Sequence, residues 1–160
     1  MKRIITLITL LLISASIFAQ EARSIYNRYS DEPGISAVYI SPAMFRLIGR
    51  IPDLDTGSGD VDISPVIRSL SGMYLISSSN PEVNARLRAD VERFISRGHF
   101  ELLMEAKEDG EAVRLFTEGT DEIIKSFVFL AAEPGECTFI SFDGQIGRAE
   151  FEDLIANSAR

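Results

Sequence analysis

Four strand-like segments in the C-terminal half of the chain restrict the fold more than any other feature. Residues 100–107, 112–117, 122–132 and 137–143 show alternation or apolar runs typical of strands. Each neighbouring pair is separated by a short turn sequence that contains Gly, so each strand can pair directly with the next one. The pattern predicts an antiparallel meander of four strands, with 122–132, the most apolar segment, in the centre of the sheet.

Upstream of the meander, helices and strands alternate. Ser41-Pro42 and Ser64-Pro65 each combine a residue that caps free helical amides with one that suits the first helical turn, so we expect a short helix after each pair. Strands are expected over 35–40, covered on both faces, and over 73–77. Helical spacing predicts a long helix over 81–97 and a last helix in the tail after residue 146.

These elements predict an α+β fold, a two-layer sandwich with one mainly antiparallel sheet and helices on one face. In such a fold, one face of each meander strand packs against the helices. The polar alternates Glu101, Lys107 and Arg114 should then be exposed or face a partner.

The N-terminus has the three parts of a secretory signal peptide. Lys2 and Arg3 precede an uncharged apolar run over residues 4–18, which is short for a membrane span, and Ala19 is a small residue suited to cleavage. We expect a signal peptide over 1–19, with an uncleaved anchor as the alternative. A lipid anchor would need Cys where Gln20 stands, so none is expected.

After cleavage we expect a polar leader over 20–34 and a single α+β domain over 35–157. The whole chain carries 24 acidic and 16 basic residues, a formal net charge of −8. That balance opposes binding to nucleic acid and to anionic membrane surfaces. The protein is therefore expected to be soluble in the periplasm or outside the cell, without a membrane span after cleavage.

Two residues with reactive side chains occur once each. Cys137, the only cysteine, cannot form an intramolecular disulfide, and its alternation with Phe139 indicates a buried apolar role. A reactive thiol or an intermolecular disulfide is the alternative. His99 lies between the long helix and the meander. We interpret it as a polar residue at a junction, with catalysis alongside nearby carboxylates as the alternative. No cofactor is expected.

An acidic segment lies between the two short helices. Its carboxylates, Asp53, Asp55, Asp60 and Asp62, are a candidate set of calcium ligands. The spacing departs from an EF-hand because Ser58 stands where Gly is required and no Glu closes the loop. We therefore expect no metal site there, and any calcium binding should be weak.

Three arginines form a stripe along the predicted long helix: Arg86, Arg93 and Arg97. Glu82 and Asp90 lie four residues before and after Arg86, a spacing that forms ion pairs on a helix. A solvated ion-pair face is one interpretation. The other is a binding site for an anionic partner on these arginines.

The segment FELLMEAKEDGEAVRLFTEGTDEIIKSFVFLAAEPGECTFISFDGQI, followed by a helix with Phe151 and Leu154, resembles a family of small exported Bacteroidetes proteins, a domain of unknown function (DUF4252). The ISP turn and the PEVNARLRADVERFI helix are also similar to that family, so the resemblance extends from Ser36 to Leu154. It rests on core and turn residues and implies no catalytic residue. It does imply an exported protein. Genes of the family tend to lie near those of extracytoplasmic sigma factors, so the resemblance also implies a link to envelope signalling.

Together these observations favour an exported binding or interaction module rather than an enzyme. Its partner would be an envelope protein, docked on a sheet face or on the arginine stripe. The alternatives are an enzyme of unrecognised type that uses His99, and a regulator of envelope signalling that co-purifies with an anti-sigma factor or a membrane receptor.

Overall fold

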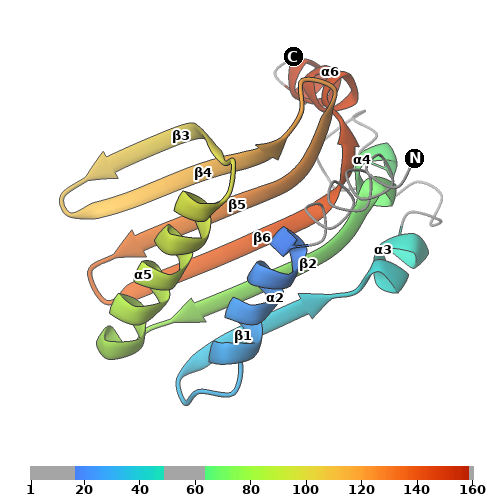
Figure 1. The fold of residues 1–160 in the computed structure, drawn as a ribbon. Helices are drawn as coiled ribbons and strands as arrows, with labels where there is room; N and C mark the ends of the chain where they lie inside the picture. Colours follow the sequence, from blue (N-terminus) through green and yellow to red (C-terminus); the bar gives the residue numbers. More distant parts are fainter. Residues whose placement is uncertain (1–16, 49–63, 159–160) are drawn as a thin grey trace, which may run out of the picture.

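A computed structural model describes residues 17–48 and 64–158 (Figure 1). Its six strands form one antiparallel sheet in the order β1-β2-β6-β5-β4-β3. The C-terminal four strands form the predicted meander, with β5 and β6 inside the sheet. The strands are β1 (Ile35–Ile40), β2 (Leu70–Ser78), β3 (Glu101–Glu108), β4 (Glu111–Gly119), β5 (Ile123–Glu133) and β6 (Glu136–Gly147).

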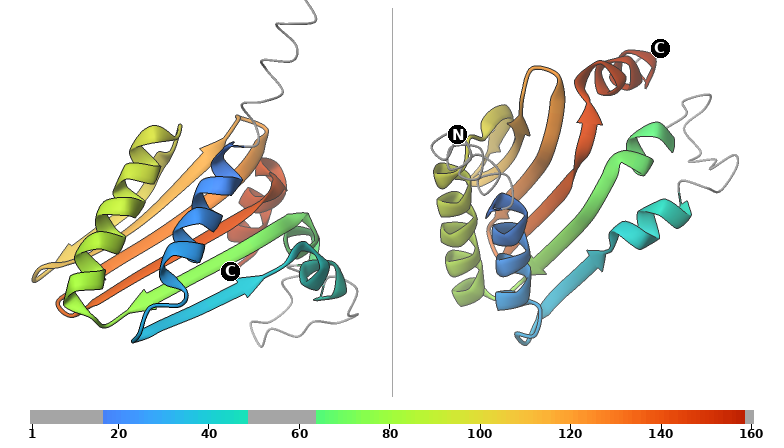
Figure 2. Two further views of the ribbon diagram at one scale, coloured as in Figure 1. Left: turned by 60° about the horizontal axis from the view of Figure 1, so that its bottom comes forward. Right: turned by 45° about the vertical axis from the view of Figure 1, so that its right-hand side comes forward.

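Two helices, α2 and α5, lie side by side on one face of this sheet (Figures 1 and 2). The α+β class is therefore confirmed. None of the helices in the described part of the chain is long and apolar enough to cross a membrane. The helices are α2 (Ile17–Tyr29), α3 (Pro42–Ile48), α4 (Ser64–Ser69), α5 (Pro81–Arg97) and α6 (Arg148–Ser158).

Local signals fix the helix α5 and the first turn of the meander. Asn80 caps α5 by accepting a hydrogen bond from the amide of Glu82 at 3.0 Å, and Pro81 occupies the first turn. The predicted bounds of α5 are confirmed. In the turn between β3 and β4, Asp109 and Gly110 both have positive φ, as a two-residue hairpin requires.

The helix α2 was not predicted, because the polar residues of 20–34 suggested only a leader. Ala22, Ile25 and Tyr29 nevertheless recur at helical spacing and are buried. They join the core formed by α5 and the inward side chains of β2, β5 and β6. Thus α2 belongs to the layer of helices that covers the sheet.

The expectation that residues 35–40 are covered on both faces is wrong. The strand β1 lies at an edge of the sheet, and the side chain of Val38 is 43% exposed. An edge strand has a neighbour on one side only, so fewer side chains shield it. The short helix α3 is likewise half-covered, because it buries Phe45 while Met44 and Leu47 stay exposed.

The prediction for Arg114 is also wrong, whereas Glu101 and Lys107 are exposed as expected. The Arg114 side chain is only 21% exposed, because it points to the same face as α5 and pairs with Glu92 of that helix at 3.1 Å. It also donates to Glu105 on β3 at 2.8 Å. Arg114 and Glu105 thus face the helices, and the neighbouring Leu115 and Met104 face the other way.

Candidate functional site

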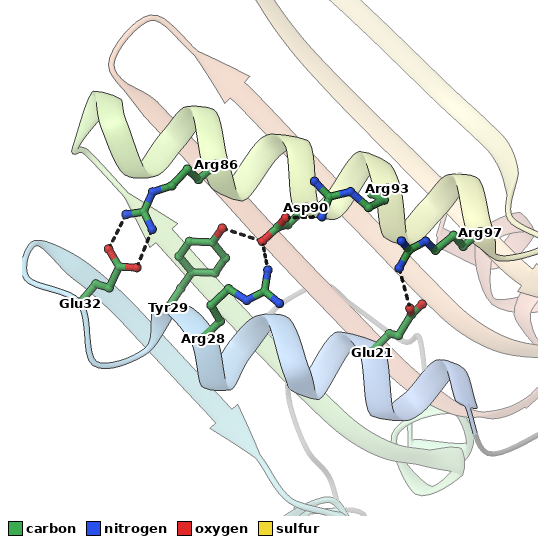
Figure 3. A network of polar contacts seen from close by, with 8 residues as sticks. All are labelled: Glu21, Arg28, Tyr29, Glu32, Arg86, Asp90, Arg93 and Arg97. Carbon is green, nitrogen blue, oxygen red and sulfur yellow. Dashed lines mark hydrogen bonds and ion pairs between the residues drawn. The ribbon is translucent and has the colours of Figure 1, made fainter.

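Figure 3 shows that Arg86 and Arg97 of the predicted stripe reach the turn after α2 and α2 itself, while Arg93 runs along α5 to Asp90. Arg86 donates to both carboxylate oxygens of Glu32, at 3.2 and 2.7 Å. Arg97 lies 3.7 Å from the carboxylate of Glu21. The pairs expected within α5, from Glu82 and Asp90 to Arg86, are replaced by pairs between elements, because α2 brings its own carboxylates within reach.

Asp90 is the centre of this network. It accepts hydrogen bonds from Tyr29 at 2.8 Å, from Arg93 at 2.8 Å and from Arg28 (Figure 3). Burial alone would raise the pKa of Asp90, but the hydrogen bonds from Tyr29 and Arg28 outweigh it and lower the pKa. The pKa of Tyr29 is raised to about 12 by burial and by its bond to Asp90. The network therefore holds α2 on α5 with charges of both signs.

A small open pocket of about 70 Å³ lies beside this network, between α2 and α5. Its lining includes Arg28, Arg93, Arg97 and Glu21. Sites for small organic ligands usually enclose roughly 300–1,000 Å³. This pocket is therefore too small to enclose such a ligand, although a small anion could reach its arginines.

The other residues singled out in the sequence lie apart. Cys137 is buried, as predicted, and burial raises the pKa of its thiol to about 11. His99 is exposed between α5 and β3. Within 17–48 and 64–158, no three His, Cys, Asp or Glu side chains cluster as metal ligands would. The acidic candidates Asp53, Asp55, Asp60 and Asp62 fall outside the described residues.

The sheet face opposite α2 and α5, here called the outer face, carries a continuous line of apolar side chains. The pairing register places one such residue of each strand in a single row, here called the apolar row. In sheet order, the apolar row is Val38, Leu75, Ile140, Phe129, Leu115 and Met104. None of the six is buried: the end residues Val38 and Met104 are 43% and 47% exposed, and the others are partly exposed.

Two further rows flank the apolar row on the outer face. One consists of Ile40, Met73, Phe142, Phe127, Thr117 and Glu101, of which only the first four are apolar, and Phe127 also contacts Phe151 of α6 at 4.9 Å between ring centroids. The other row changes from small polar residues to small apolar ones: Ser36, Ser77, Thr138, Ala131, Val113 and Ala106. No charged residue lies in the apolar row or in this last row.

A profile of the family described as "Domain of unknown function (DUF4252)" matches residues 29–154 of the chain. The chain belongs to this family. No curated protein and no solved structure matches it. The resemblance stated from the sequence is thus confirmed as to the family.

The DUF4252 match divides the two candidate surfaces unequally. All six strands lie inside residues 29–154, so the whole outer face is part of the DUF4252 domain. In the polar network, Glu21 and Arg28 precede the match, while Tyr29, Glu32 and the residues of α5 lie within it. The outer face is therefore the surface that the family domain supplies entirely by itself.

Sequence reasoning missed the apolar row and the contribution of α2 to the network. A signal for the row was present, because Phe127, Val128, Phe129 and Leu130 are apolar in both phases of a strand. That composition is typical of a strand covered on both faces. The partners of the arginines had no such signal, because Glu21 and Glu32 are distant from them in the sequence.

Proposed function

We propose that this DUF4252 protein is exported to the periplasm or cell envelope and works there as a binding module, docking an envelope protein on its outer face. The apolar row is the observation that carries this proposal. A sheet that is apolar on both faces normally buries both, and α2 and α5 cover only one of them (Figure 2). Contiguous exposed apolar surface is typical of interaction sites.

The apolar row is a better docking site than the arginine stripe. Arg86, Arg93 and Arg97 already contact carboxylates of their own chain. A partner that bound these arginines would have to displace those carboxylates, whereas a partner on the apolar row displaces only water.

The packing of α2 supports export with cleavage after Ala19. The buried side chains Ala22, Ile25 and Tyr29 all follow that position. Cleavage would therefore remove the first residues of α2 and keep the ones through which it packs on α5 and the sheet.

The proposal can be tested by expressing the full chain in a diderm bacterium. Mass spectrometry of the exported protein should find Gln20 at the N-terminus. Met1 on a cytosolic protein would contradict the export part.

Binding is tested with the same protein immobilised against envelope extract. We expect a specific partner that Met104→Lys, in the apolar row, fails to recover. Leu47→Lys, which charges an exposed side chain on α3, is the matched control and should recover it fully. An anti-sigma factor or a membrane receptor as the partner would support the signalling role. Equal recovery by both variants would contradict docking on the outer face, and turnover of a substrate without any partner would favour the enzyme that uses His99.

A further inference from the structure

We infer that the outer face binds a second copy of this chain, so that two sheets pack face to face around a two-fold axis. The inference rests on the proposed function, because it names the partner of the same surface. It follows from the size of the face, the lack of charge in its apolar row and the charged β3 edge of the sheet.

The face is large enough for a dimer. Neighbouring positions on one face are about 4.8 Å apart across the strands and about 7 Å apart along a strand, so each covers about 34 Å². The two complete rows and the four apolar residues of the third make sixteen positions, or roughly 540 Å². Two such patches would together bury about 1,100 Å², just above the roughly 1,000 Å² that a specific interface should clear. Stacked sheets pack with their strands about 30° apart, which would keep the two apolar rows in contact.

The chemistry of the face favours an identical partner. In a two-fold interface each residue meets the same surface of the other copy, so the surface must complement itself. The apolar row meets this condition in either direction, because all six side chains are aliphatic, aromatic or thioether. Homodimer interfaces are also more apolar than those between different proteins.

The distribution of charge also favours the apolar row as the place where two copies meet. Two copies that each carry a formal net charge of −8 repel one another wherever their charged surfaces approach. The outer face keeps charges at its rim, for example Glu136, and out of the apolar row. A partner of opposite charge would instead be recognised through charged side chains, which the apolar row lacks.

The β3 edge of the sheet is less suited to pairing between copies. All eight residues of β3 are exposed, but Glu105, Lys107 and Glu108 place charges along this edge, and the pairing register shifts between Leu102 and Met104. Charged side chains and bulges are the devices that prevent strands from adding to an edge. We therefore place the second copy on the outer face.

Light scattering and sedimentation of the exported protein over a range of concentrations test the inference. We expect a dimer that becomes at least tenfold weaker in Met104→Lys and in Val38→Lys, while Leu47→Lys leaves it unchanged. In Ile140→Cys, at the middle of the apolar row, mild oxidation should give a disulfide-linked dimer. Arg23→Cys, an exposed position on α2, is the control and should form no disulfide-linked dimer under the same oxidation.

Four outcomes would overturn the inference. A dimer that the apolar-row variants leave intact would have another interface. A monomer whose Met104→Cys thiol is shielded from a labelling reagent in buffer would have the face covered by its own chain. A monomer whose thiol becomes shielded only in envelope extract would have a different partner, so the proposed function would survive; a thiol that stays reactive in extract would contradict both proposals.

Discussion

Replacing Asp90 by Ala should loosen α2 from the rest of the protein. Asp90 is the only acceptor shared by Tyr29, Arg28 and Arg93 within the described network (Figure 3), and its side chain is 12% exposed. The two arginines are more than half exposed, so each pair contributes about 0.2–1 kcal/mol. The hydrogen bond from the buried Tyr29 to a charged acceptor contributes about 1.5–3 kcal/mol.

We therefore expect Asp90→Ala to lower the free energy of unfolding by about 2–5 kcal/mol, measured by urea denaturation at neutral pH. Hydrogen exchange should show the largest loss of protection in α2. A double-mutant cycle separates the contributions: the coupling of Asp90→Ala with Tyr29→Phe should exceed its coupling with Arg28→Ala. Glu32→Ala, which breaks one exposed pair with Arg86, is the control and should cost about 1 kcal/mol or less.

The pH dependence gives a second test of Asp90. Its folded-state pKa is lowered below the ordinary value of 3.8, so its contribution is present above that value and is lost as the pH falls through the folded pKa. Wild type and Asp90→Ala should therefore differ at neutral pH and converge in acid. A difference below about 0.5 kcal/mol at neutral pH, or equal couplings to Tyr29 and Arg28, would refute this account of the network.

Three further predictions concern other parts of the fold. Burial raises the pKa of Asp143 to about 6 despite a hydrogen bond from Ser126, so stability should fall as the pH rises from about 4 to about 6; Asp143→Asn should abolish that slope and add about 2–3 kcal/mol at pH 7 in urea titrations. Cys137 should react with a thiol reagent at pH 8 at least tenfold more slowly in the folded protein than in urea, since burial raises its pKa to about 11. Gly119→Ala should cost about 1–3 kcal/mol in thermal unfolding, because the new Cβ would lie 2.2 Å from the carbonyl oxygen of Ile123, whereas Gly72→Ala meets only the Tyr74 ring at 3.7 Å and should cost less.

Elements with local signals were predictable from the sequence. Asn80 and Pro81 mark the start of α5, and Asp109-Gly110 marks the turn between β3 and β4. Each signal acts within a few residues, so no knowledge of the rest of the fold is needed. The α+β class and the meander follow from such signals.

The polar network could not be predicted, because its partners come from two helices. Sequence spacing placed Glu82 and Asp90 beside Arg86, but Glu32 binds Arg86 with both carboxylate oxygens. A bidentate pair between elements displaces a single contact within a helix. Finding it required α2, whose three buried residues are separated by polar ones.

Which face of each strand the helices cover was harder to predict from the sequence. A period of two residues shows that a strand has two kinds of face, but it does not show which one the helices cover. In β4 the helices cover the face of Arg114, whose guanidinium is satisfied by Glu92 and Glu105. Leu115, the next residue, is left on the outer face.

This arrangement also bears on function. An exposed apolar row adds little to the stability of a single copy and favours unspecific association. Replacing Leu115 or Phe129 by a polar residue would remove that risk at small cost if the outer face only met water. Their presence in register with four other apolar side chains is accounted for if the face is buried in a complex, which gains about 25 cal/mol for each Å² of apolar surface removed from water. For Leu115, the alternation with Arg114 predicted a covered side chain, and a second molecule on the outer face would supply that cover.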